Sequence, residues 1–161
     1  MTVVEAPIVR AAEPGDETLL FALFCEDKAA QLAAVGLGQA QIQMLIEMQY
    51  RGRTMTYSAA YPDAMELMIV EPDSAAVGHM LLDRNPDRWR IVDIAVLAAH
   101  RGRGLGTRVL QDCKRQAAAA GAAIELQVEP YNPARRLYER LGFRATEEDV
   151  MNVKMVWDGA N

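Results

Sequence analysis

The sequence is poor in cysteine. Its two cysteines, Cys25 and Cys113, lie far apart and form no Cys-x-x-Cys pair. Two cysteines exclude a disulfide framework, and free thiols are typical of a reducing compartment, so we predict a cytoplasmic protein. The histidines, cysteines and carboxylates are nowhere spaced as metal ligands are, so we predict no bound metal.

Long apolar runs and positive charge are also scarce. No run approaches the roughly 18–20 residues that span a bilayer, so we expect no membrane partner. Residues 1–7 lack the basic flank and apolar segment of a signal peptide. The 17 lysines and arginines are outnumbered by 22 aspartates and glutamates, which gives a net charge of −5. This balance argues against a nucleic-acid partner, which needs a basic face, and suits a cationic substrate such as an amine.

Length and hydrophobic content predict one domain covering residues 1–161. Hydrophobic residues make up 51% of the chain, which is enough for a sizeable core. Apolar periodicity and turn residues then divide the chain into elements. We predict strands at residues 3–11, 64–70, 76–82, 89–97, 123–128, 143–146 and 150–157. We predict helices at residues 16–24, 39–61, 105–120 and 133–141, the first of them capped by Asp16.

The connections predict an α/β fold with a single mixed, mostly antiparallel β-sheet of about seven strands and helices on both faces. Tight turns make the strands between residues 64 and 97 an antiparallel meander. Strands 89–97 and 123–128 are joined by a crossover helix, so they should be a parallel pair, and a cleft opens if they diverge. The methionines are expected to fill the core or line a substrate pocket, among them Met44, Met48, Met65, Met68 and Met80.

What the sequence does have is a turn rich in glycine and arginine between a strand-like and a helix-like run. Glycine lets the main chain approach a ligand closely, and the unpaired N–H groups that start a helix favour an anion. The turn is neither a Walker loop nor a dinucleotide fingerprint, because it lacks Gly-Lys-Ser/Thr and has Thr107 where a third glycine would stand. We therefore predict a pyrophosphate cradle, with a plain tight connection as the alternative. The cradle comprises Arg101, Gly102, Arg103, Gly104, Leu105, Gly106 and Thr107.

A second motif follows the next predicted strand. It reads Asn132-Pro133-Ala134-x-x-Leu137-Tyr138-x-x-Leu141-Gly142-Phe143, while the first reads Arg101-x-x-Gly104-x-Gly106 after an apolar strand. Together the two motifs resemble the GNAT superfamily of acyl-CoA-dependent N-acetyltransferases, over about residues 60–157. The resemblance implies a GNAT-like fold, acetyl-CoA as co-substrate and direct transfer of the acetyl group to an amine acceptor.

The resemblance also implies roles for single residues. The main chain of Ile94, Ala95 and Val96 would pair with the pantetheine arm, and the Val96 amide would donate to the thioester oxyanion. Tyr138 would protonate the leaving CoA thiolate, although it could instead be a helix residue with a solvated hydroxyl. Asn132 stands six positions before Tyr138, whereas seven is commoner in the family, so Asn132 either contacts the cofactor or only caps the helix.

The sequence leaves three candidates for the general base that would accept the proton of the amine. Asp93, a carboxylate inside an apolar strand, is the first candidate for general base, Glu66 is the second, and a bound water is equally open. Asp93 could alternatively pair with a buried arginine. We predict His79 to be a hydrogen-bonded core histidine, and His100 lies at the rim of the cradle. Arg135 and Arg136 belong to a solvated helix face, unless one of them reaches the 3′-phosphate of CoA.

The acceptor itself cannot be read from the sequence beyond a small-molecule or peptide amine. Residues 39–61 and the late hairpin are expected to shape its site. The competing interpretation is a non-catalytic acyl-CoA-binding module that acts as a sensor or assembly subunit, and an interaction domain without a ligand is a third. Because homodimers are common in the family, the resemblance also implies a homodimer.

Overall fold

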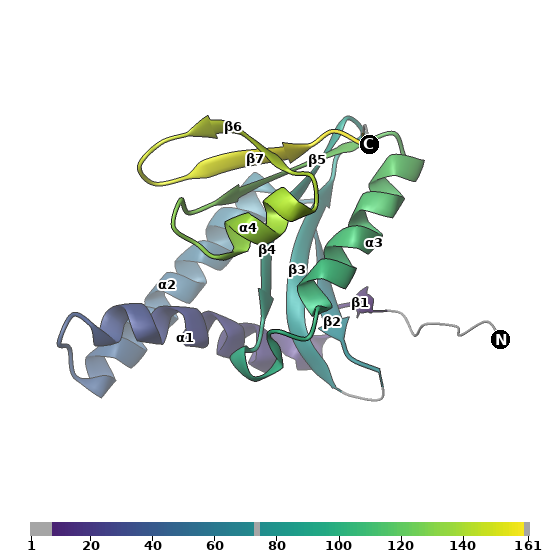
Figure 1. The fold of residues 1–161 in the computed structure, drawn as a ribbon. Helices are drawn as coiled ribbons and strands as arrows, with labels where there is room; N and C mark the ends of the chain where they lie inside the picture. Colours follow the sequence, from purple (N-terminus) through teal and green to yellow (C-terminus); the bar gives the residue numbers. More distant parts are fainter. Residues whose placement is uncertain (1–7, 73–74, 160–161) are drawn as a thin grey trace.

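The computed structural model describes residues 8–72 and 75–159 (Figure 1). Its strands form one sheet in the order β1-β2-β3-β4-β5-β7-β6, in which β4 and β5 are parallel and the other neighbours are antiparallel. The strands are β1 (Val9–Ala11), β2 (Met65–Val70), β3 (Ala76–Arg84), β4 (Arg88–Val96), β5 (Ala123–Val128), β6 (Arg144–Glu148) and β7 (Val153–Trp157). The helices are α1 (Glu17–Ala33), α2 (Gln39–Ala60), α3 (Leu105–Ala119) and α4 (Ala134–Arg140). The predicted fold class is confirmed.

The helices cover both faces of this sheet (Figure 1). On one face, α3 packs on β4 and β5 through a stripe with helical spacing, which joins the main core. On the other face, α1 packs on β3 and on α2, and a second, smaller apolar layer forms around Phe24, Ile46 and Met68. None of the helices in the described ranges is long and apolar enough to cross a membrane.

A β-bulge in β4 opens the sheet. Leu81 of β3 pairs with Asp93, but Leu82 pairs with Ile91, so Val92 is an extra residue in β4. A bulge of this kind bends its strand and increases the local twist. The parallel pairing of β4 with β5 accordingly ends at Ile91, although β4 continues to Val96. The predicted cleft between the two strands therefore begins at the bulge.

The N-terminal elements differ from the prediction. Helix α1 continues to Ala33 instead of ending near Phe24, because no glycine or proline interrupts the chain before Gly36. Asp16 does not cap α1 with its side chain; it receives the Glu13 N–H at 2.8 Å and pairs with Arg10. The predicted strand 3–11 is described only from residue 8 onward, and residues 1–7 lie outside the described part of the chain.

The predicted packing of the methionines is partly wrong. Met68 and Met80 are buried, but Met44, Met48 and Met65 are exposed, with 64% of Met44 and 66% of Met48 accessible. The reason is that α2 packs on α1 through a narrow face, so Ile46 is its buried residue in the structure. The apolar stripe of α2 is broad in the sequence, but the contact of α2 with α1 in the structure is narrow.

Candidate active site

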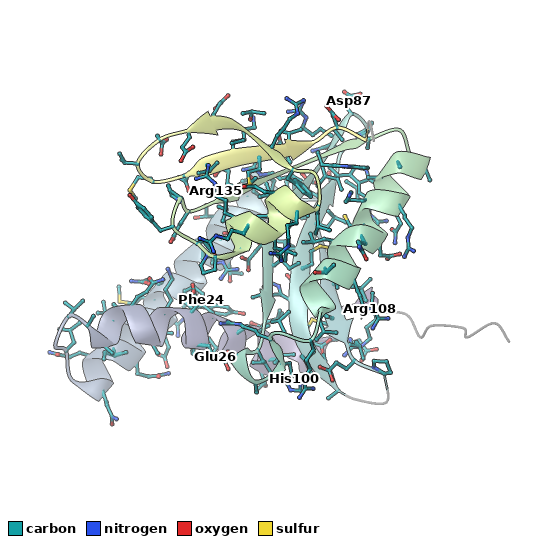
Figure 2. The ribbon with its side chains drawn as sticks, in the orientation of Figure 1. Phe24, Glu26, Asp87, His100, Arg108 and Arg135 are labelled. Atoms are coloured by element: carbon teal, nitrogen blue, oxygen red, sulfur yellow. The ribbon has the colours of Figure 1, made fainter. Side chains whose placement is uncertain are left out.

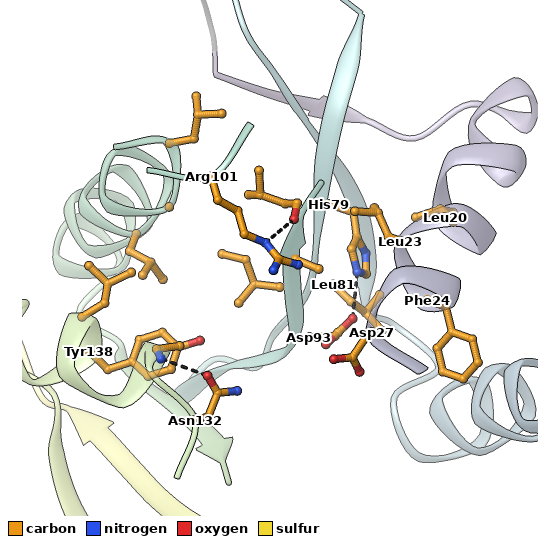
Figure 3. Close-up of a pocket in the computed structure, with 18 of the residues that line it drawn as sticks. Leu20, Leu23, Phe24, Asp27, His79, Leu81, Asp93, Arg101, Asn132 and Tyr138 are labelled. Carbon is orange, nitrogen blue, oxygen red and sulfur yellow. Dashed lines mark hydrogen bonds and ion pairs between the residues drawn. The ribbon is translucent and has the colours of Figure 1, made fainter. Parts of the chain in front are cut away.

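A cavity of about 1230 Å³ joins the glycine turn to the face of the sheet that carries α1 and α2. It passes between the splayed ends of β4 and β5. Figure 3 shows Tyr138 and Asn132 on one wall, His79, Asp93 and Phe24 on the opposite wall, and Arg101 between them. The cavity thus brings both sequence motifs and the candidate bases to one space.

The glycine turn has the geometry of an anion cradle. Gly102 and Gly104 both have positive φ, 79° and 77°, which glycine adopts without strain. The backbone N–H groups of residues 102–107 make no hydrogen bond to the described part of the protein, and the first helical bond comes from the Arg108 N–H to the Gly104 carbonyl. A Cβ built on Gly102 or Gly104 would meet no atom within 4 Å, so the space beside these two residues is open.

The cationic side chains of the cradle are already engaged. Arg101 donates from Nε to the Val96 carbonyl at 2.9 Å. Arg103 and His100 both contact Glu71, which follows β2, with the His100 Nδ1 3.0 Å from Glu71 Oε1. His100 is thus paired at the rim of the cradle. The amides supply donors that make no bond within the described protein, beside the remaining guanidinium N–H groups of Arg101 and Arg103.

The cradle is also tied to α1. Glu26 accepts a hydrogen bond from the Ala98 N–H at 2.9 Å, in the short turn that leads from β4 into the cradle. Figure 2 shows Glu26 and His100 at the same end of the molecule. This hydrogen bond connects α1, on one face of the sheet, to the turn that leads into α3, on the other face.

The free edge of β4 presents its backbone to the cavity. Since the Leu97 N–H bonds the Val77 carbonyl of β3, the preceding residue, Val96, turns its N–H and carbonyl toward the opposite edge. The bond from Arg101 to the Val96 carbonyl agrees with that orientation. The backbone N–H and carbonyl groups of Ile94 and Val96 thus point into the gap between β4 and β5. Those of Ala95 point toward β3.

Gly78 supports this edge and was not singled out in the sequence. It pairs with Val96, and a Cβ at Gly78 would lie 2.5 Å from the Ala95 carbonyl oxygen and 3.1 Å from the Val96 Cα. The available signal was a lone glycine inside a predicted strand, which often marks a close approach of another backbone.

We therefore expect Gly78→Ala to destabilise the protein by about 1–3 kcal/mol through overpacking. Urea denaturation measures this change. Gly52→Ala is the matched control, because a Cβ at Gly52 meets nothing within 4 Å and lies in a helix. The control should stabilise slightly, by about 0.5–1 kcal/mol. Equal stability of wild type and Gly78→Ala would contradict the proposed close approach.

Tyr138 and Asn132 form the far wall. Tyr138 of α4 is buried and packs against Phe143 with ring centroids 6.0 Å apart. Burial, followed by the charge of Asp93, raises the pKa of Tyr138 to about 12, so its hydroxyl stays protonated at neutral pH. Asn132 Oδ1 accepts the Ala134 N–H at 2.9 Å, so its oxygen caps the start of α4. In the same helix, Arg135 is paired with Glu148 on the protein surface.

Three titratable side chains from neighbouring strands meet on the opposite wall. His79 of β3 places Nδ1 against Glu66 of β2, and its Nε2 lies 2.7 Å from Asp93 Oδ2 of β4. Arg53 of α2 binds the same carboxylate oxygen. His79 is buried and hydrogen-bonded as predicted, but its partners are the two candidate bases. Asp93 also pairs with an arginine, as the alternative interpretation of this residue predicted.

The bulge explains why the three side chains meet. Trp89 and Ile91 lie in the main core, and strict alternation along β4 would place Asp93 on that same apolar face. The extra residue Val92 shifts the alternation by one position, so Asp93 turns to the α2 face beside His79. The sequence alone gave no sign of this shift.

Charge pairing fixes the protonation states of this cluster. Burial alone would lower the pKa of His79, but its hydrogen bonds to Asp93 and Glu66 outweigh burial and raise it to about 9. Burial would raise the pKa of Asp93, but the hydrogen bond from His79 and the charge of Arg53 lower it. At neutral pH, an imidazolium therefore bridges two carboxylates.

This shift predicts a pH dependence of stability. Because the pKa of His79 is higher in the folded state than its ordinary 6.5, its contribution is complete below about pH 6.5 and is lost as the pH rises through about 9. We expect a loss of about 3 kcal/mol across this window, measured by urea denaturation at pH 6.5 and 9.5. His79→Gln should lack this slope, and an equal slope in that variant would refute the assignment.

The sequence profile described as "Acetyltransferase (GNAT) family" matches residues 37–143. A comparison with curated proteins gives no significant match.

Solved structures with the same fold include several acetyltransferases. The PaiA N-acetyltransferase of Thermoplasma acidophilum, in complex with coenzyme A, has a TM-score of 0.70 at 17% identity, over 93% of this chain and 97% of that one. An acetyltransferase of Elizabethkingia anophelis with acetyl-CoA bound has a TM-score of 0.54 at 15% identity, over 62% and 80%. Aminoglycoside 6′-acetyltransferase type Ii has a TM-score of 0.62 at 16% identity, over 96% and 99%. At these identities the likeness concerns the fold.

Proposed function

Because this chain belongs to the acetyltransferase (GNAT) family, we propose that it moves an acetyl group from acetyl-CoA directly to an amine acceptor. One observation carries the proposal. A single cavity joins unpaired amides suited to a diphosphate, a buried protonated tyrosine and a carboxylate cluster. Two structural neighbours that hold CoA or acetyl-CoA support the choice of co-substrate.

The cradle would hold the diphosphate of acetyl-CoA through the amides of residues 102–107, with the dipole of α3 favouring the negative charge. Amides need no reorganisation when the ligand arrives. The free edge at Ile94 and Val96 would pair with the pantetheine arm, and the Val96 N–H would face the thioester carbonyl as it gains negative charge. Asn132, whose Oδ1 caps α4, would contribute its side-chain –NH2 group to the same wall.

Tyr138 and Asp93 would carry out the two proton transfers of the reaction, one to the departing thiolate and one from the acceptor amine. Tyr138 is the acid that protonates the departing CoA thiolate, since its hydroxyl is protonated and lines the cavity. Asp93 is the acceptor of the amine proton. Because its pKa is lowered, Asp93 is a weak base toward a free ammonium, so the neutral form of the acceptor, which carries the lone pair, attacks the thioester. Formation of the C–N bond then acidifies the nitrogen, and its proton passes to Asp93.

Transfer would be direct. Neither Cys25 nor Cys113 lines the cavity, so no cysteine is placed to carry the acetyl group. Helix α2, which spans most of residues 39–61, would shape the acceptor side. One structural neighbour is named for an aminoglycoside, an amine-bearing small molecule, which supports an amine acceptor here.

The decisive experiment supplies acetyl-CoA and a library of amines and records the release of free thiol. Amine-dependent release supports the transferase. Tight CoA binding without turnover of any amine would instead identify an acyl-CoA-binding module. No thermal shift with CoA would indicate an interaction domain without this ligand.

A further inference from the structure

Arg53 is held rigidly inside the acceptor side of the cavity. Its guanidinium carbon lies 5.2 Å from the centre of the Phe24 ring and 5.1 Å from that of Tyr57, and Nη2 binds Asp93. Cation–π contacts with two rings restrain the position of a guanidinium, and the carboxylate restrains its rotation. Such a side chain is preorganised to receive a planar ligand.

Most of the hydrogen-bonding capacity of Arg53 is unused. A guanidinium has five N–H donors, and Arg53 makes one hydrogen bond to the described residues, that to Asp93. The side chain is 28% exposed and lines the cavity. A fixed guanidinium edge with free donors matches the two oxygens of a carboxylate, which it can bind in a bidentate manner.

The Arg53–Asp93 pair offers both signs of charge side by side. An α-amino acid carries an ammonium and a carboxylate on one carbon, so its two charges are also adjacent. The ammonium would contact Asp93, which His79 links to Glu66. The carboxylate would contact Arg53.

The same geometry disfavours the other kinds of amine. A plain amine would leave the free edge of Arg53 without a partner. A polycationic amine would bring a second positive charge close to the Arg53 guanidinium, which binds Asp93 and repels that charge. We propose that the acceptor is an α-amino acid whose carboxylate binds Arg53 while its amine lies at Asp93. This assignment rests on the proposed acetyl transfer, because it names the acceptor of that reaction.

The test uses acceptor pairs that differ only by the carboxylate. L-phenylalanine is compared with 2-phenylethylamine, and L-leucine with 3-methylbutylamine, by thiol release with acetyl-CoA. We expect kcat/KM to be about 10- to 100-fold higher for the amino acid of each pair, the usual size for one charge-assisted contact. The amide L-phenylalaninamide, which keeps the shape without the charge, should behave as the amine does.

Arg53→Gln should remove this preference and bring the kcat/KM ratio within each pair close to one, mostly through KM. Arg53→Lys, which keeps the charge without the planar fork, should retain part of it. Arg51→Gln is the matched control, because Arg51 is exposed on the same helix outside the cavity, and it should leave the ratio unchanged. Titration of L-phenylalanine into the enzyme saturated with CoA should show binding that Arg53→Gln weakens by a similar factor.

The possible results separate the two claims. Equal turnover of amines and amino acids, or a preference that survives in Arg53→Gln, would overturn the amino-acid assignment and leave the transferase intact. Absence of thiol release with every acceptor would overturn the proposed function, and the amino-acid assignment would fall with it.

Discussion

Replacement of Gly104 by valine is expected to lower the affinity for CoA at least about 100-fold. Gly104 caps α3 with a φ of 77°, a conformation that costs a β-branched residue about 1–2 kcal/mol. The valine side chain would also fill the open space beside Gly104, where the diphosphate is proposed to lie. Loss of two charge-assisted N–H contacts at about 1.5–3 kcal/mol each accounts for the expected factor.

Isothermal titration with CoA measures this loss, and Gly36→Val is its matched control. Gly36 has nearly the same φ, 79°, and equally open surroundings, but it lies between α1 and α2 and does not line the cavity. Both variants should therefore lose similar stability, while only Gly104→Val should lose CoA. Unchanged affinity in Gly104→Val, or an equal loss in Gly36→Val, would show that the diphosphate is held elsewhere.

Replacement of Tyr138 by phenylalanine is expected to lower kcat by about 10²–10⁴-fold while CoA affinity stays the same. The substitution removes only the hydroxyl that would protonate the thiolate, and the ring still packs against Phe143. Because the pKa of Tyr138 is raised to about 12, the hydroxyl remains protonated across the range of an assay. The loss should therefore be equally large at pH 7 and pH 9.

Steady-state kinetics with a reactive amine tests this result, and Tyr131→Phe is the control. Tyr131 also lies at the cavity but is 96% exposed, so its hydroxyl is solvated and its loss should not change kcat. If kcat in Tyr138→Phe stays within about threefold of wild type, well below the usual acid–base contribution, another group or water protonates the thiolate. Retained CoA binding keeps that result distinct from misfolding.

The parts of the site encoded by short segments could be predicted from the sequence. Gly102 and Gly104 adopt the positive φ that makes the cradle, and the helix-spaced apolar residues after them pack as α3. Asn132 precedes a short helix that carries Tyr138, as its motif indicated. These features depend on the backbone preferences of single residues and on their spacing over a few positions, and both can be read directly from the sequence.

Contacts between distant segments were not predictable in the same way. Arg53 was only one of several polar residues on a long helix, and nothing in its spacing indicated that it would lie between two rings and bind Asp93. The same holds for Glu71, whose contacts with His100 and Arg103 join segments separated by β3 and β4.

By itself, then, the sequence determined the glycine turn, the tyrosine helix, the antiparallel meander and the parallel strand pair, because each follows from local conformation, periodicity and the length of the connections. The tertiary structure decided which charged side chains meet on the wall of the cavity opposite Tyr138. One inserted residue, Val92, turns Asp93 from the apolar core to the face of His79 and Glu66. Register of this kind is set by pairing across the whole sheet, so no short segment contains it.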